Sequence, residues 1–354
     1  MNLYINEKNE ERKRGAYLGI RPDRVPVDFS DQLDFLNGWK DLDCQKFHLD
    51  AAVMMKHQID FNKRFGGGGI LGPNFGVALE ASAFKAEILF TKENPPWVIE
   101  SCKNYDDLDD YVDQLEDPHP LFSGHLPLFY QTFNYMNSIA GGTLSAPLGC
   151  IASIDIATLL VGMENFSIAI KLNPKTIHKL LKKINKFLIN FIEARIDYFG
   201  VESVEMLDLY GDNTGYISPE DFMEFVAPYN KEIYDYFSTD KTVKLFHCDG
   251  KLEQHVKILP EMGCNCLYSF DPTANLEMFV EELGDELCLV GNLDPIQILR
   301  NGTPEIVREE VKRIVTIGKK AKSFVLCTGG ELANGTPPEN IDVLLETLDE
   351  YGAY

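Results

Sequence analysis

The sequence has few basic residues and no long apolar run. Its 354 residues contain 33 Lys and Arg against 55 Asp and Glu, which gives a formal net charge of −22 at pH 7. Binding to nucleic acid or to an anionic membrane surface requires clustered Lys and Arg, and no such cluster is present. No apolar stretch reaches the roughly 20 residues that a membrane-spanning helix needs. The sequence therefore predicts that neither nucleic acid nor a membrane is a partner.

A secretion signal and a zinc-knuckle spacing are also missing. Residues 1–20 are polar and charged, unlike a signal peptide. The eight cysteines are scattered, and Cys264 and Cys266 are too close together for the usual zinc knuckle. We therefore expect a cytoplasmic protein whose thiols are reduced.

The glycine fingerprint of a dinucleotide-binding fold is absent too, although strands and helices alternate. From about residue 142, apolar segments rich in β-forming residues are followed at least five times by helical patterns. Such alternation is typical of a parallel sheet buried on both faces. The predicted strands are 143–146, 204–208, 243–248, 265–270, 287–291 and 324–326. The predicted helices are 153–163, 174–199, 251–262, 276–283, 303–319 and 337–350.

The first 130 residues show a less regular pattern. We expect a charged helix over 6–18 on the outside of the body, helical structure over 31–60, a β-hairpin over 84–99 and a short acidic helix over 106–115. The glycine-rich segment 66–76 is either a mobile active-site loop or a plain linker. We interpret the chain as one domain, 1–354, in which residues 1–80 form an extension and loop region packed on the body.

Polar residues stand at the carboxyl end of nearly every predicted strand. In an α/β barrel all strands direct these ends to one side, where active sites are found. The pattern therefore favours a TIM barrel over an open doubly wound sheet. The residues concerned are Asp28, Asp208, Asp212, His247, Asp249, Asp271, Asn292 and Glu331.

The segment 243–250 carries the clearest chemical signal. Side chains alternate across a strand, so His247 and Asp249 project to one face and Cys248 to the other. An imidazole and a carboxylate side by side can bind a metal or transfer protons. The alternative is a histidine near a strand end followed by an aspartate that caps the next helix.

Several motifs, in a specific order, resemble those of the uroporphyrinogen decarboxylase superfamily. This resemblance covers the chain from about residue 10 to the end and implies a (β/α)8 TIM barrel with an N-terminal extension. True decarboxylases carry an arginine-rich loop after the first motif, and residues 27–34 contain no arginine. We therefore do not expect uroporphyrinogen decarboxylation. The motifs are Pro22-Asp-Arg-Val-Pro26, Ile217-Ser-Pro-Glu220, His247-Cys-Asp-Gly250, Gly291-Asn-Leu-Asp-Pro295, Gly302-Thr-Pro-Glu305 and Thr336-Pro-Pro-Glu-Asn340.

The other branch that the sequence resembles consists of corrinoid-dependent methyltransferases. The resemblance implies a zinc cofactor and a separate corrinoid-carrying protein as partner. Thiol-methylating members have cysteines where Asp249 and Gly330 stand here. The implied ligands are therefore His247 and Asp249, with Glu331 or Cys327 as the third. A zinc ion held by more oxygen ligands is better suited to bind an ether oxygen of the substrate than a thiolate.

The resemblance thus points to an O-demethylase-like enzyme. A methyl group would pass from a small methyl donor, an aryl methyl ether, to cob(I)alamin on the partner, giving methylcobalamin there. Asp208 or Asp212 would orient substrate or act as general acid, and Tyr210 and Tyr216 would stack on a ring. Members of the superfamily often dimerise, so a homodimer is a further expectation.

Alternatives remain open at this point. Asp271 and Asn292 are further candidate substrate-binding residues. A different ligand set, Glu220, Cys248 and Cys288, requires Cys248 to face inward. A metal-free decarboxylase or lyase would use His247 and the carboxylates for proton transfer. A barrel that binds a ligand without chemistry is the third hypothesis.

Overall fold

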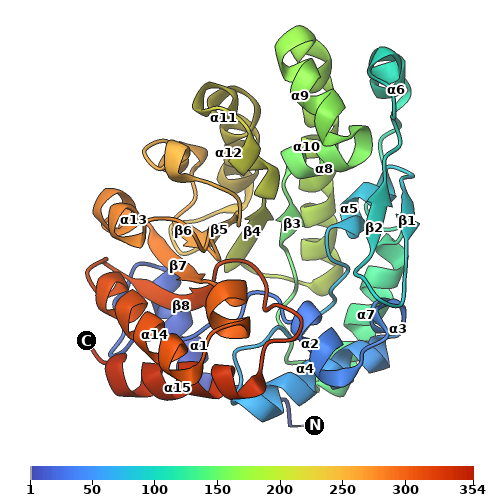
Figure 1. Ribbon diagram of the computed structural model, residues 1–354. Helices are drawn as coiled ribbons and strands as arrows, with labels where there is room; N and C mark the ends of the chain where they lie inside the picture. The colour runs from blue at the N-terminus through green and yellow to red at the C-terminus, as the bar shows by residue number, and fades with distance from the viewer. Residues whose placement is uncertain (1) are drawn as a thin grey trace.

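The fold is built on one parallel sheet whose strands are adjacent in chain order (Figure 1). The structure, a computed structural model, describes residues 2–354. Val27 forms a parallel bridge with Leu326, so the segment around Val27 extends the sheet beyond its last strand. This order, with helices outside the strands, confirms the predicted α/β barrel. The strands are β3 (Cys150–Ile151), β4 (Met206–Tyr210), β5 (Val243–His247), β6 (Cys266–Tyr268), β7 (Cys288–Leu293) and β8 (Phe324–Thr328).

Helices connect these strands and pack outside them. Between β3 and β4 lie α8 (Ser153–Val161), α9 (Met163–Leu172) and α10 (Pro174–Phe199). A 3-10 turn (Asp212–Tyr216), α11 (Pro219–Phe225) and α12 (Ala227–Phe237) then lead to β5. The later connections contain α13 (Leu276–Leu283), a π-helical turn (Pro295–Arg300), α14 (Pro304–Gly318) and α15 (Pro338–Tyr351).

The N-terminal region is mostly helical. It contains α1 (Glu7–Tyr17), α2 (Leu33–Lys40), α3 (Cys44–Leu49), α4 (Ala51–Phe65), α5 (Ala78–Ala83), α6 (Leu108–Gln114) and α7 (Leu126–Ile139). The predicted hairpin is confirmed as β1 (Glu87–Leu89) paired with β2 (Trp97–Ile99). Because Val27 joins the sheet, part of the 1–80 region belongs to the barrel itself and is not only packed on it.

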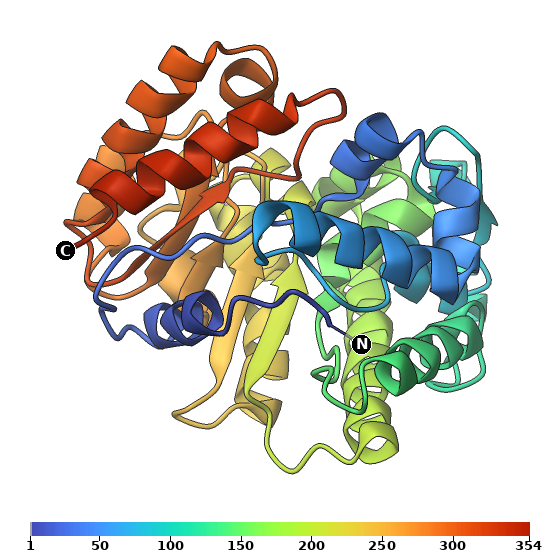
Figure 2. The ribbon, with the colours of Figure 1, turned by 90° about the horizontal axis from the view of Figure 1, so that it is seen from below.

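Side chains of the strands divide into two packing layers. One set, including Phe246, packs outward in the large core shared with the helices. The other fills the barrel interior: Val243, Leu245, Cys266, Tyr268, Cys288, Val290, Val325 and Cys327. Ala16 and Tyr17 of α1 pack against this interior set. Helix α1 therefore covers the barrel interior, a closer role than the outside position that the sequence predicted (Figure 2).

The glycine-rich segment 66–76 is tied to the body by side chains that are buried. Asn62 Oδ1 accepts a hydrogen bond from the N–H of Gly69 at 2.9 Å, and Gln58 Oε1 accepts one from Gly72 at 3.0 Å. Gln32 Oε1 likewise binds the N–H of Ile70 at 3.2 Å. These bonds favour the interpretation as a linker over that as a mobile active-site loop.

Two predicted elements are wrong. The segment 143–146 is not a strand, because its polar groups bond locally: the N–H of Leu144 donates to Asn137 at the end of α7. The strand is instead β3, further along the chain. The predicted helix 251–262 is two short 3-10 turns, Glu253–His255 and Leu259–Met262. Pro260 interrupts the last part of the predicted helix, since proline lacks the N–H that a helix interior requires.

No single described helix is long and apolar enough to cross a membrane. Helices α8 and α9 pass that test only together, and they are bent by 109° at their junction.

Candidate active site

His247 ends β5 with its side chain almost completely buried. Its Nδ1 lies 3.0 Å from the carbonyl oxygen of Tyr268 on the neighbouring strand. A carbonyl oxygen only accepts, so Nδ1 carries the proton and Nε2 is the free ring nitrogen. Nε2 lies 3.4 Å from Oδ1 of Asp212. The sheet thus orients the imidazole toward the loop that follows β4.

Asp212 and Asp249 complete a compact group with His247. One possible ligand atom from each residue lies within 4.8 Å of the other two. The loops after β4 and β5 are joined here, because the backbone N–H of Asp249 donates to Asp212 Oδ1 at 3.1 Å. Burial, together with the charge of Asp212, raises the pKa of Asp249 to about 6. A cation, or a proton shared between the two side chains, would relieve the repulsion between the carboxylates of Asp212 and Asp249.

The sequence reasoning missed Asp155, in the first turn of α8. Its Oδ1 accepts hydrogen bonds from the backbone N–H and the side-chain Nδ2 of Asn213, at 3.2 and 3.0 Å. Its Oδ2 is buried without a partner. Burial and the nearby Asp212 raise the pKa of Asp155 well above its ordinary value. The available signal was an aspartate in an otherwise apolar helix start directly after a strand.

Glu331 and Cys327 lie outside the compact group. Gly330 comes close to it, since a Cβ atom there would be 3.2 Å from Oδ2 of Asp249. The next side chain, Glu331, is surrounded by other acids: burial, followed by the charges of Asp31 and Asp34, raises the pKa of Glu331 to about 9. Cys327 is buried in the barrel interior instead. The structure does not bring either side chain into the group of His247.

Below His247, two side chains of β4 face the barrel interior. The ring of Tyr210 lies 5.5 Å from that of His247, centroid to centroid. Burial and the nearby Asp28 raise the pKa of Asp208 to about 7, and its Oδ1 has no partner. Asp28 itself is held by Lys13 at 3.2 Å and by the hydroxyl of Tyr17. Tyr210 therefore lies beside the imidazole, and Asp208 lies two residues earlier on the same strand, opposite Leu245.

The remaining substrate-binding candidates differ in placement. Tyr216 is 77% exposed, so its ring is not enclosed as a stacking partner would be. The carboxylate of Asp271 accepts from the N–H and hydroxyl of Thr273 and so stabilises its own turn. Asn292 is buried; its Nδ2 donates to the carbonyl oxygens of Asp271 and Ala274. Its Oδ1 has no partner.

The alternative ligand set is not assembled. Cys248 belongs to the outer core, with Sγ 3.6 Å from the backbone oxygen of Asp212. Cys288 lies in the barrel interior, in register with Cys266 at the start of β7. Glu220 is in the first turn of α11. Because side chains alternate along the chain at the end of β5, Cys248 faces outward, as the sequence predicted. It is therefore not brought together with Glu220 and Cys288.

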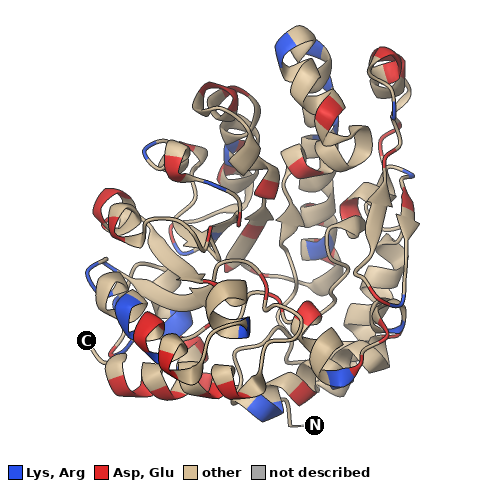
Figure 3. Ribbon diagram, viewed as in Figure 1, with Lys and Arg blue, Asp and Glu red and all other residues tan. Residues whose placement is uncertain are grey.

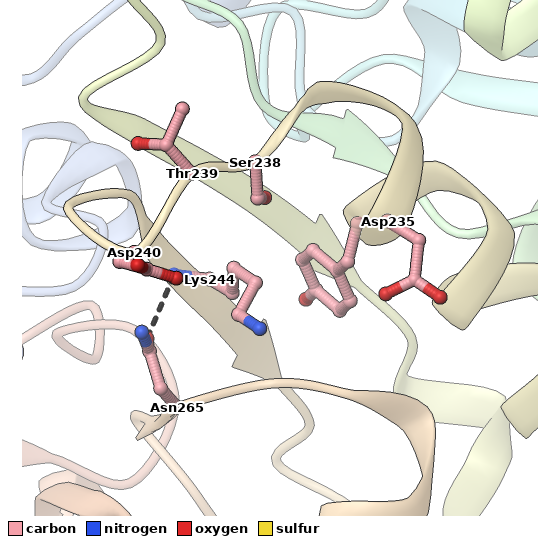
Figure 4. Close-up of a pocket in the computed structure, with 7 residues that line it drawn as sticks. Asp235, Ser238, Thr239, Asp240, Lys244 and Asn265 are labelled. Atoms are coloured by element: carbon pink, nitrogen blue, oxygen red, sulfur yellow. Dashed lines mark hydrogen bonds between the residues drawn. The ribbon is translucent and has the colours of Figure 1, made fainter.

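A polar hollow of about 360 Å³ lies at the opposite end of β5 from His247 (Figure 4). Its lining comes from the end of α12, the loop that follows it and the starts of β5 and β6. Lys244 is the only cationic side chain among these lining residues. The lining residues are Tyr234, Asp235, Ser238, Thr239, Asp240, Lys244 and Asn265. This hollow is separate from the group around His247.

Comparison with known proteins gives consistent matches. Residues 9–351 match the uroporphyrinogen decarboxylase (URO-D) family. The uroporphyrinogen decarboxylase of Pseudoalteromonas translucida is 30% identical over 185 residues, 51% of this chain and 50% of that protein. The match thus spans about half the length of such relatives. The methylated-thiol–coenzyme M methyltransferase of Methanosarcina mazei is 23% identical over 279 residues, 78% of this chain and 71% of that one.

A solved structure, of a methyltransferase from Methanosarcina mazei, shares the fold. It superposes with a TM-score of 0.78 at 17% identity and covers 97% of this chain and 98% of its own. This likeness agrees with the barrel described above. Because the family match extends over nearly all of the sequence, the chain belongs to the URO-D family.

Proposed function

We propose that the protein is a methyltransferase that moves a methyl group from a small methylated substrate to cob(I)alamin on a partner corrinoid protein. The observation that carries this proposal is the compact group of Asp212, His247 and Asp249. Similarity to the methylated-thiol–coenzyme M methyltransferase over 78% of the chain supports it. Uroporphyrinogen decarboxylation is disfavoured, because the segment after Pro26 supplies acids in place of arginines.

The three side chains fit a zinc ion. Catalytic zinc takes three protein ligands from nitrogen, sulfur and oxygen donors and keeps one position open. The hydrogen bond from Nδ1 of His247 to Tyr268 leaves Nε2 available, as is usual for a ligating histidine. Asp212 and Asp249 would supply the oxygen donors. When bound, zinc supplies Lewis acidity to the substrate oxygen.

We propose an aryl methyl ether as the methyl donor. The bond between methyl carbon and ether oxygen breaks as the electron pair of cobalt(I) forms a new bond to carbon. The oxygen keeps the electrons of the broken bond and needs a proton or a cation. Glu331 lies outside the compact group, but it is a reservoir for that proton, since burial and neighbouring acids raise its pKa to about 9. Tyr210 offers an aromatic face next to His247.

The competing metal-free decarboxylase would need cations to hold a substrate carboxylate. In the described part of the chain, Asp212 pairs only with His247, and neither Asp249 nor Glu331 pairs with Lys or Arg. A site in which no Lys or Arg pairs with these groups lacks the cation that a substrate carboxylate requires, which favours methyl transfer.

Metal analysis of the purified protein tests the proposal. We expect about one zinc per chain, lost in His247→Ala, and zinc-dependent methylation of cob(I)alamin with 2-methoxyphenol as donor. His119→Ala is the matched control, because His119 is exposed and distant in sequence. Absence of metal from the wild-type protein after zinc is supplied, or turnover that survives in His247→Ala, would refute the mechanism.

A further inference from the structure

We infer that Ser269 is a positioning residue for the metal site, because it fixes the carbonyl group that orients His247 and the loop that packs against Asp249. This inference rests on the proposed function and adds to it a residue that offers no ligand atom itself. Three observations carry it: the backbone conformation of Ser269, the hydrogen bonds of its hydroxyl, and the contact between Gly330 and Asp249.

The peptide group between Tyr268 and Ser269 lies directly beside the imidazole of His247. Its carbonyl oxygen, on Tyr268, is 3.0 Å from Nδ1 of His247. Its N–H, on Ser269, donates to the carbonyl oxygen of Val290 on β7 at 2.7 Å. Rotation of this peptide group would move the acceptor that decides which ring nitrogen carries the proton, and so which nitrogen is free to bind a metal.

Ser269 has a backbone conformation that is unfavourable for a serine. It directly follows β6, and its φ is +49°, in the left-handed region. Such a conformation is strained in a residue other than glycine and persists only where the surrounding contacts impose it. Glycine would adopt it without strain. What serine adds at this completely buried position is a hydroxyl group.

The hydroxyl of Ser269 joins the end of β6 to the end of β8. It donates to the carbonyl oxygen of Thr328 at 2.9 Å and accepts a hydrogen bond from the N–H of Gly330 at 2.9 Å. The carbonyl oxygen of Ser269 accepts a longer bond from the same N–H, at 3.2 Å. The hydroxyl of Thr328 donates to the carbonyl oxygen of Gly330 at 2.6 Å. Gly330 is therefore fixed by both the side chain and the backbone of Ser269.

Gly330 in turn packs against Asp249. A Cβ atom added to Gly330 would lie 3.2 Å from Oδ2 of Asp249 and 3.6 Å from its Cβ. In the part of the chain that the structure describes, neither Asp212 nor Asp249 pairs with Lys or Arg. Figure 3 shows acidic segments near the strands in the middle of the ribbon as well as on the outer helices. Because ion pairs with Lys or Arg do not hold these carboxylates, backbone contacts such as this one must position them.

Ser269 thus acts on two of the proposed ligands without contacting a metal. It sets the ring of His247 through the carbonyl group of Tyr268, and it limits the space of Asp249 through Gly330. Residues that support metal ligands in this way typically contribute about 10–100-fold to metal affinity.

Zinc affinity of the full-length protein, measured by competition with a chromophoric chelator, tests the inference. Ser269→Gly removes the hydroxyl and keeps the left-handed conformation without strain, and Ser269→Ala removes the hydroxyl but keeps Cβ. We expect both variants to bind zinc at least about tenfold more weakly than the wild type. Ser323→Ala is the matched control and should not change the affinity. Ser323 is equally buried, its hydroxyl has no partner, and it directly precedes β8, at the opposite end from Thr328.

The metal-free protein gives a second readout, which a merely structural role would not move. NMR of the ring nitrogens shows which nitrogen of His247 carries the proton, and His247→Ala assigns the signal. We expect the proton on Nδ1 in the wild type and in Ser323→Ala, and a mixture of the two tautomers in the variants of Ser269.

Each outcome decides the matter. Unchanged zinc affinity, or an unchanged tautomer, in both variants of Ser269 overturns the inference and leaves the proposed function intact. A loss of affinity in Ser269→Gly that Ser269→Ala does not share also overturns it, because backbone flexibility and not the missing hydroxyl would then be the cause. Failure of the wild-type protein to bind zinc overturns the proposed function together with this inference. If one variant does not fold, the other carries both measurements.

Discussion

The backbone N–H of Asp249 donates a hydrogen bond to the carboxylate of Asp212, 3.1 Å away, and so joins the loops after two neighbouring strands. Asp212 thereby has two roles in the proposed site, because it offers an oxygen to a metal and also positions a second ligand. Both residues lie just beyond their strands, Asp212 at the start of a 3-10 turn.

Asp212→Ala should therefore weaken zinc binding at least tenfold, an effect of the size seen when residues that support a metal site are removed. The measurement is zinc affinity by competition with a chromophoric chelator. Asp240→Ala is the control, because Asp240 is exposed and lies near the opposite end of β5. Unchanged affinity in Asp212→Ala would remove Asp212 from the ligand set.

At Gly330 a side chain would be crowded, and the backbone conformation is unfavourable for any residue other than glycine. Its φ is +92°, and an added Cβ would lie 3.2 Å from Asp249 Oδ2. Gly330→Ala should therefore lower the free energy of unfolding by about 1–2 kcal/mol, the usual cost of a left-handed conformation for an L-residue. Urea unfolding measures this. Gly72→Ala is the control, since no atom lies within 4 Å of its added Cβ; an equal loss there would contradict the reasoning.

The raised pKa of Glu331 predicts that the stability of the protein depends on pH. Burial and the nearby Asp31 and Asp34 raise its pKa from 4.5 to about 9, so the folded state retains a proton that the unfolded chain releases. The contribution of the neutral acid is complete below pH 4.5 and is lost as the pH rises toward 9. Metal-free Glu331→Gln has no such proton to lose.

We expect Glu331→Gln to match the wild type near pH 4.5 and to be more stable by about 1–3 kcal/mol near pH 8. Urea unfolding of the metal-free proteins at both pH values measures the difference. Glu339→Gln, at the first turn of α15, serves as control. A stability difference that does not grow with pH would show that Glu331 is ionised in the folded protein.

The sequence predicted the parts of this protein that follow from local periodicity. Alternation along β5 correctly separated His247 from Cys248, because the side-chain period of a strand is fixed. The sequence also identified Asp212, although as a catalytic acid and not as a neighbour of His247 in a ligand group. Spacing along the chain does not reveal which loops meet beyond the strand ends.

Other features depend on contacts between distant residues. The position of β3 is linked to Arg195, whose guanidinium binds the carbonyl oxygens of the residues just before the strand. No local pattern indicates that bond. The exposure of Tyr216 follows from the orientation of a 3-10 turn, and the closeness of Asp155 to Asp212 depends on how α8 packs beside that turn.

Asp155 allows a direct test of that packing. Its Oδ1 holds both the backbone N–H and the side chain of Asn213, the neighbour of Asp212 in sequence. Asp155→Asn keeps an oxygen at this position, whereas Asp155→Ala removes it. If Asp155 positions the turn, Asp155→Ala should weaken zinc binding about 10–100-fold and Asp155→Asn should change it little. A merely structural role would lower the stability of Asp155→Ala without changing its zinc affinity, and a direct ligand role would weaken zinc binding in both variants. Chelator competition and urea unfolding on the same two proteins separate these results.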